Sequence, residues 1–216
     1  PSLRRRSCWA GMNKHILYLA AGSSSRFGSN KLLCPLEEKP LFRHGLDTLA
    51  ALVQGRKDCD LTVVSRYAPI LEAAAAAGAR AVDSPDSARG LSFTIRAGLS
   101  ALAPIPAEDF LLFAAADQPR LGSGTAARLL DAARPGVLTA AACWEGQPGN
   151  PVLFSAALLP ELEAITGDQG GRVVLRRHWD LCILLPAEDP LELADADTPE
   201  ALLALRQGES DTLKSY

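Results

Sequence analysis

The residues best suited to chemistry lie in one glycine- and serine-rich stretch, residues 19–31. Its two glycines let the backbone approach a ligand closely, and successive N–H groups in a tight loop form a cradle for an anion. Arg26 can grip phosphate oxygens with its fork of donors, and Lys31 adds a compact positive charge. The apolar run 16–20 leads directly into this stretch and predicts a buried strand. The sequence therefore predicts a polyphosphate site at the carboxyl end of a first strand.

Two common glycine loops do not fit this stretch. The pattern G-x-x-x-x-G-K-[ST] fails because five residues separate Gly22 from Gly28 and because Lys31 does not follow the second glycine directly. The pattern G-x-G-x-x-G fails because Ser24 stands where its second glycine should be. The alternative without function is a serine-rich turn between a strand and a helix, with incidental charges.

The stretch does resemble the signature L-A-A-G-x-S-x-R-x-G-x-x-K of nucleotidyltransferases, in the branch similar to MobA and MocA. Those enzymes join a nucleotide to the phosphate of molybdopterin. The resemblance implies that the nucleotide is bound by Ala20, Ala21, Gly22, Ser23, Arg26 and Lys31. It also implies that Arg26 and Lys31 take part in catalysis.

Two aspartates far apart in the sequence are candidates for a metal site. Asp117 follows the apolar run 110–116, and Asp197 stands two residues before a proline that suits the first turn of a helix. Because open α/β sheets bind ligands beyond the carboxyl ends of their strands, both carboxylates are expected at one rim. Mg²⁺ prefers one or two carboxylates with phosphate oxygens and water, so the pair predicts a magnesium site in which Asp117 is also catalytic. Asp197 matches the second acidic or amide ligand of the resembling family best, with Asp195 as the near competitor, and Asp197 has the alternative role of a helix cap.

Three weaker segments resemble family motifs around the two substrates. In the family, the counterpart of the glycine loop 90–98 lies beside the base and ribose; the alternative here is a helix cap with core packing. Residues 147–154 resemble the family's G-H-P-V segment, with an asparagine in place of the histidine, and residues 167–172 resemble G-D-x-G-A-R. The further nucleotide-binding residues implied are Ser84, Gly90, Ser92 and Thr94, and the acceptor-binding residues implied are Asn150, Asp168 and Arg172.

Histidine and cysteine chemistry has little support. The three histidines precede a strand or belong to helix patterns, which favours structural or solvent-facing roles. The five cysteines are scattered without a C-x-x-C pair, which disfavours a disulfide framework and a zinc site and suits a reducing cytosol. A phosphate nucleophile is ionised near neutral pH, so the protein is expected to position the substrates and neutralise charge.

The elements that must position these residues alternate between strand and helix patterns. Strands are expected at residues 16–20, 60–65, 81–82, 110–116, 137–141 and 181–185, with a short extended crossing at 32–40. Helices are expected at residues 42–55, 69–78, 90–99 and 123–133 and after residue 198. This alternation predicts an α/β fold: a three-layer α/β/α sandwich with a mainly parallel, Rossmann-like sheet, as in nucleotide-diphospho-sugar transferases.

Length and composition set further expectations. The chain of 216 residues suits one domain, expected over residues 12–208. Residues 1–11 carry three consecutive arginines with no apolar stretch after them, so they look foreign to the fold, either an added segment or a mis-set start before Met12. A net charge of −3 indicates neither a nucleic-acid surface nor a polybasic membrane patch. A cytoplasmic protein is expected, since no apolar stretch approaches the roughly 18–20 residues that cross a bilayer.

The resemblance implies transfer of a nucleotide from an NTP to molybdopterin, with release of pyrophosphate and dependence on Mg²⁺. Ala21 favours CTP, because guanylyl relatives usually carry glycine at this position. Two alternatives stay open. One is a cytidylyltransferase for a sugar phosphate or polyol phosphate, and the other is a non-catalytic maturation chaperone whose partner is a molybdenum hydroxylase. Asn150, which replaces the family's histidine, keeps the choice of acceptor open.

Overall fold

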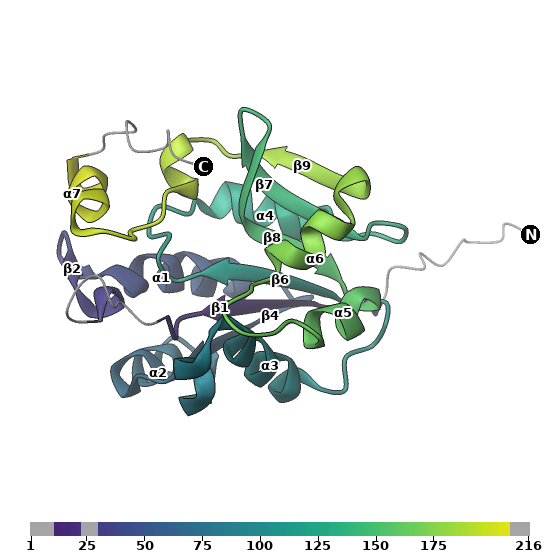
Figure 1. Cartoon of the computed structure of the whole chain (residues 1–216), viewed down its shortest axis with the longest axis horizontal. Helices are drawn as coiled ribbons and strands as arrows, with labels where there is room; N and C mark the ends of the chain where they lie inside the picture. Colours follow the sequence, from purple (N-terminus) through teal and green to yellow (C-terminus); the bar gives the residue numbers. More distant parts are fainter. Residues whose placement is uncertain (1–10, 23–29, 208–216) are drawn as a thin grey trace, which may run out of the picture.

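A seven-stranded sheet forms the centre of the molecule in the computed structural model, which describes residues 11–22 and 30–207 (Figure 1). The strand order is β5-β4-β1-β6-β8-β7-β9. The strands are β1 Lys14–Leu19, β4 Cys59–Ser65, β5 Arg80–Asp83, β6 Phe110–Ala115, β7 Thr139–Trp144, β8 Gln147–Ser155 and β9 Cys182–Pro186. Neighbouring strands pair in parallel except at β8, which is antiparallel to both β6 and β7. The predicted α/β class with a mainly parallel sheet is confirmed.

Helices cover both faces of this sheet. They are α1 Leu41–Gln54, α2 Ala68–Ala76, α3 Leu91–Leu102, α4 Ser123–Asp131, α5 Leu159–Glu163, α6 Arg172–Arg177 and α7 Pro199–Gln207. In β1, Ile16 and Tyr18 pack into one apolar cluster with α1, α2, α4 and α7, whereas Leu17 packs into a second cluster with α3, α5 and α6. Side chains of a strand point alternately to its two faces, so this division follows from the strand itself. The predicted three-layer arrangement is confirmed.

The antiparallel strand β8 is a feature that the sequence analysis did not anticipate. It forms a hairpin with β7 through a two-residue turn, Glu145 and Gly146, whose φ angles are 48° and 78°. Positive φ at both turn residues matches the right-handed twist of the flanking strands. Pro148 and Pro151 lack the N–H group that a sheet uses, and they obscure the strand pattern in the sequence. Pairing with β6 accordingly begins at Val152, just after the second proline.

The segment expected as an extended crossing is more structured than predicted. It holds the 3-10 turn η1 Lys31–Leu33 and a small two-stranded sheet, β2 Pro35–Leu36 and β3 Lys39–Pro40. The Asn30 side chain caps the 3-10 turn by accepting a hydrogen bond from the Leu32 N–H at 3.1 Å. This turn directs Lys31 inward, so that the residue is only 8% exposed.

Short 3-10 helices also join several larger elements. They are η2 Pro85–Arg89, η3 Ala156–Leu158, η4 Trp179–Leu181 and η5 Pro190–Leu193. Within residues 11–22 and 30–207, every helix is too short or too polar to span a bilayer.

Candidate functional site

A cleft of about 800 Å³ opens at the carboxyl ends of β1 and β6. This is where open α/β sheets bind ligands. Its lining includes ten residues that the sequence analysis assigned to substrates or metal: Ala21, Gly22, Lys31, Gly90, Thr94, Asp117, Asn150, Asp168, Arg172 and Asp197. The fold therefore brings together positions that are up to 176 residues apart in the sequence.

Three other predicted nucleotide-binding residues are buried beside the cleft and do not line it: Ala20, Ser84 and Ser92. Ser84 accepts a hydrogen bond from the Ser87 hydroxyl at 2.7 Å, and Ser87 accepts one from Thr94 at 2.8 Å. This chain of hydroxyl groups holds the loop before α3 against the helix. Ser23 and Arg26 lie outside the described residues, so their roles stay predictions.

The charges at the cleft centre on Lys31. Its Nζ lies 2.9 Å from Oδ2 of Asp117 and 2.6 Å from Oδ1 of Asp197. Burial by itself would lower the pKa of Lys31, but the charge of Asp117 and hydrogen bonds to both carboxylates outweigh it and raise the pKa. Lys31 therefore stays charged and cross-links the carboxylates that follow β6 and precede α7.

Asp195 joins this group as a third acid. Burial raises its pKa to about 7, and the nearby charges of Asp117 and Asp197 act in the same direction. We call Lys31, Asp117, Asp195 and Asp197 the cleft cluster. Its three carboxyl groups face one ammonium group, so the cluster carries excess negative charge that a bound cation would relieve.

This donor set fits the predicted magnesium site. Asp117 and Asp197 already direct one oxygen each at a single cation, the Lys31 ammonium. Across the described part of the chain, no three His, Cys, Asp or Glu side chains are arranged to hold a metal ion together, so two carboxylates are the expected protein ligands here. Mg²⁺ is commonly held by one or two carboxylates, with the other positions filled by phosphate oxygens and water. Magnesium binding by Asp117 and Asp197 stays a prediction, and Asp195 remains the competitor.

The two loops that are predicted to hold the two substrates touch directly through their backbones. The Ser92 N–H donates to the Gly167 carbonyl at 3.0 Å. Gly90 has φ +136°, and a Cβ placed on it would lie 2.5 Å from that same carbonyl oxygen. Only glycine can occupy such a position. The loop that leads into α3, predicted to hold the nucleotide, is therefore seated on the loop 167–171, predicted to hold the acceptor.

The sequence analysis missed the apolar wall of the cleft. Phe113 and Phe154 line it with ring centroids 5.2 Å apart, and a Cβ on Gly171 would meet both rings at 3.0–3.1 Å. Arg89 also lines the cleft and stacks 4.3 Å from the Phe93 ring centroid. Phe113 is within a predicted strand, but the face to which it points depends on the register of β6 against β8, which no motif specifies.

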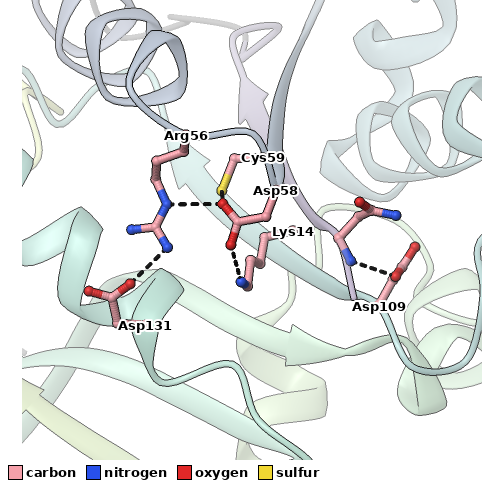
Figure 2. Close-up of polar contacts among 7 residues, drawn as sticks. Lys14, Arg56, Asp58, Cys59, Asp109 and Asp131 are labelled. Carbon is pink, nitrogen blue, oxygen red and sulfur yellow. Dashed lines mark hydrogen bonds and ion pairs between the residues drawn. The ribbon is translucent and has the colours of Figure 1, made fainter. Parts of the chain in front are cut away.

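A second charged cluster lies at the opposite, amino-terminal end of the strands (Figure 2). Lys14 pairs with Asp58, whose other oxygen is 3.3 Å from Nε of Arg56. Arg56 reaches Asp131 at 2.7 Å. We call Lys14, Arg56, Asp58 and Asp131 the basal network. It pairs two cations with two carboxylates, and none of the four residues lines the cleft.

The three histidines also make contacts outside the cleft. His15 lies 2.7 Å from Asp60 and 3.2 Å from Asp109, His44 lies 2.9 Å from the Leu36 carbonyl oxygen, and His178 lies 2.7 Å from Glu161. These contacts agree with the structural roles expected for all three.

A family model for the MobA-like NTP transferase domain matches residues 16–182. The chain belongs to this MobA-like family. Nicotine blue oxidoreductase from Paenarthrobacter nicotinovorans is 30% identical to it over 195 residues, which are 87% of this chain and 93% of the relative. The purine catabolism protein PucB from Bacillus subtilis is 28% identical over 206 residues, which are 90% of this chain and 96% of PucB.

Solved structures show the same fold. Rv0371c from Mycobacterium tuberculosis superposes with a TM-score of 0.74 at 23% identity, over 91% of this MobA-like chain and 98% of Rv0371c. A further structure of Rv0371c, in complex with manganese, superposes with a TM-score of 0.69 at 21% identity, over 91% and 99% of the two chains. The resemblance drawn from the glycine-serine stretch is thus confirmed at the level of family and fold.

Proposed function

We propose that this protein transfers a nucleotide, from CTP in preference to GTP, to the phosphate of a molybdopterin-type acceptor. The observation that carries the proposal is the cleft cluster. One buried lysine and two carboxylates meet in the cleft at the carboxyl rim of the sheet. The chain belongs to a family of NTP transferase domains. The molybdenum link rests on the sequence signature that resembles MobA and MocA.

The chemistry requires little covalent help from the protein. An oxygen of the acceptor phosphate attacks the α-phosphorus of the NTP, a new P–O bond forms, and the bond to the β-phosphate oxygen breaks to release pyrophosphate. Lys31, together with Arg26 of the glycine-serine stretch, would bind phosphate oxygens and neutralise the negative charge that develops. Asp117 and Asp197 would hold magnesium, which would supply positive charge that polarises the reacting phosphate. Asn150, Asp168 and Arg172 would hold the acceptor in line.

Selection of CTP is proposed from Ala21, which lines the cleft and is 1% exposed. Its methyl group narrows the space beside the nucleotide and disfavours the larger purine. Discrimination by one carbon is typically about 1–3 kcal/mol, or roughly 10- to 200-fold. Ala21→Gly should therefore admit GTP more readily. Wild-type protein that prefers GTP would contradict the assignment.

The test is to incubate the protein with each NTP, Mg²⁺ and molybdopterin, and to follow pyrophosphate release. Release that depends on molybdopterin supports the proposal. Parallel reactions with sugar phosphates and polyol phosphates examine the alternative acceptors. Release with one of these and none with molybdopterin would overturn the proposed acceptor while keeping nucleotidyl transfer.

Two names among the relatives define the competing functions. PucB is a purine catabolism protein. The alternative kept open by the sequence analysis is a maturation chaperone, which would bind a molybdenum hydroxylase without releasing pyrophosphate. Nicotine blue oxidoreductase carries the name of a redox enzyme, so an assay of redox activity belongs beside the transfer assay. The Lys31–Asp117–Asp197 arrangement favours transfer over both, because it concentrates charges that phosphate and metal need.

A further inference from the structure

Lys31 occupies the place that a metal would take between the two carboxylates. We propose that its ammonium group is an internal counter-ion that holds the metal site closed until a nucleoside triphosphate draws the lysine away. Metal and nucleotide would then bind as a coupled pair, each weak without the other. The identity of the triphosphate rests on the proposed function, but the competition between lysine and metal does not.

The geometry makes the two cations mutually exclusive. Oδ2 of Asp117 and Oδ1 of Asp197 lie 2.9 and 2.6 Å from the same nitrogen. Mg²⁺ binds its oxygens at about 2.0–2.1 Å, so a metal that used both oxygens would lie in the immediate neighbourhood of Nζ. A second positive charge at that distance would also be strongly repelled. Lys31 must therefore move before a metal can bind both of these oxygens.

The lysine needs another anion before it can leave. Its side chain is 11% exposed, and a buried ammonium separated from its carboxylates would be costly. Lys31 lines the cleft in which a triphosphate is expected. Phosphate oxygens there would offer the ammonium group hydrogen-bond acceptors equivalent to the carboxylates. In this scheme the triphosphate releases the carboxylates by taking over the lysine, and the released carboxylates then take up the metal. Because binding free energies are reciprocal, the metal must strengthen nucleotide binding by the same factor.

The decisive experiment measures Mn²⁺ binding in the absence of nucleotide, by counting free Mn²⁺ with electron paramagnetic resonance. Lys31→Met removes the competing charge and keeps the length of the side chain. We expect this variant to bind Mn²⁺ about tenfold or more tightly than wild type, although it should lose transfer activity. Lys31→Arg keeps the charge and should bind Mn²⁺ as weakly as wild type. Binding by Lys31→Met that is no tighter than wild type would overturn the proposal.

Lys14→Met provides the matched control. Lys14 is 9% exposed and also pairs with an aspartate, but it lies in the basal network, away from the cleft. Its removal should leave Mn²⁺ binding unchanged. If Lys14→Met tightened Mn²⁺ binding as much as Lys31→Met, the effect would be one of net charge and the proposal would fail. The double variant Lys31→Met, Asp117→Asn should lose the gained affinity; retention would place the metal elsewhere and would also contradict the proposal.

A measurement on the wild-type protein does not depend on a variant that folds. With ¹⁵N-labelled lysine, the ammonium signal of Lys31 should shift when CTP and Mg²⁺ are added together, because its partners change from carboxylates to phosphate. The Lys14 signal should stay in place. A Lys31 signal that does not move while CTP demonstrably binds would overturn the proposal. Neither measurement uses turnover, so the two proposals can fail separately. If the wild-type protein releases no pyrophosphate but Lys31→Met binds Mn²⁺ more tightly than wild type, the proposed reaction is refuted and the competition between lysine and metal is not.

Discussion

The two buried lysines in the described part of the chain differ in how their charge is balanced. Lys14 and Lys31 are 9% and 8% exposed, and they pair with aspartates at opposite ends of the sheet. In the basal network two cations meet two carboxylates (Figure 2), whereas in the cleft cluster one ammonium meets three carboxyl groups. A balanced network can only hold the fold together. An unbalanced one, in an open cleft, retains negative charge that a ligand cation can neutralise.

The pKa shifts of two aspartates express the same difference. Partial burial opposes ionisation of Asp58, but hydrogen bonds from Lys14 and Arg56 lower its pKa to about 2. Burial and two neighbouring carboxylates instead raise the pKa of Asp195 to about 7. The two aspartates therefore titrate about five units apart, because Asp195 is more deeply buried and lies beside two carboxylates, whereas Asp58 is held by two cations.

The largest effect should come from Asp117→Asn, with Asp131→Asn as its counterpart in the basal network. Asp117 ends a strand at the cleft, so its replacement should reduce metal-dependent pyrophosphate release by about 100-fold or more while the fold persists. Asp131 is exposed and outside the cleft, so its variant should keep wild-type turnover and lose at most about 0.5 kcal/mol of stability. Equal turnover of the two variants would erase the functional distinction between the clusters. Steady-state kinetics and urea unfolding measure the two quantities.

The two lysines provide the next comparison, now in turnover. Lys31→Met should slow pyrophosphate release by at least about tenfold, equivalent to about 1.4 kcal/mol of transition-state stabilisation. Lys14→Met should stay within about twofold of wild type and lose about 1 kcal/mol of folding stability. A Lys31→Met variant that keeps turnover within about twofold would show that this lysine is not a catalytic charge. Circular dichroism of both variants controls for loss of structure.

Asp195→Asn should change how stability depends on pH. Because the folded state raises this carboxyl pKa to about 7, the folded protein binds the proton more tightly, and stability from this group is lost as pH rises from about 4 through 7. Asparagine stays neutral and removes that loss. The variant should thus be more stable than wild type at pH 8, by on the order of 1–2 kcal/mol, with a smaller difference at pH 4. Urea unfolding at several pH values tests this, and a gain that does not vary with pH would contradict it.

His15→Gln should show the smallest effect, and it should lower stability where Asp195→Asn raises it. A hydrogen bond to Asp60 raises the pKa of His15 despite opposing burial, and Asp109 adds to the rise. The stability from this histidine is therefore fully present below its unfolded pKa near 6.5 and is lost as pH rises through the folded pKa. The variant should be less stable than wild type at pH 5.5, by a few tenths to about 1 kcal/mol, and nearly equal at pH 9. A deficit that persists at pH 9 would indicate a packing defect instead.

Much of the fold and of the cleft was predictable because local patterns coincide with the tertiary arrangement. The apolar runs that became β1 and β6 end at the residues that line the cleft, and the rule that ligands bind at the carboxyl rim places Asp117 near Lys31. The strand β8 was missed because its prolines remove the pattern that identifies a strand. The pairing of Lys31 with Asp197 could not be predicted from the sequence, because it depends on the path of the chain between β9 and α7.

The basal network was also beyond sequence reasoning. Lys14 begins β1, Arg56 lies in the loop between α1 and β4, and Asp131 ends α4, and the fold brings these three segments to one end of the sheet. Single charged residues at element ends are common, and no spacing distinguishes those that meet. The cleft cluster could be anticipated in part because the family signature contains Lys31, whereas a purely structural network has no such signature.

The backbone contact between Gly90 and Gly167 has a consequence for altering the proposed acceptor specificity. Because a single methyl group on Gly90 would collide with the Gly167 carbonyl, the two loops form one module whose halves cannot be exchanged separately. A library that varies only residues 167–171 would have to keep the carbonyl position that Gly90 abuts and that the Ser92 N–H holds. Directed evolution toward a new acceptor should therefore transplant both loops from the same donor, as a cassette.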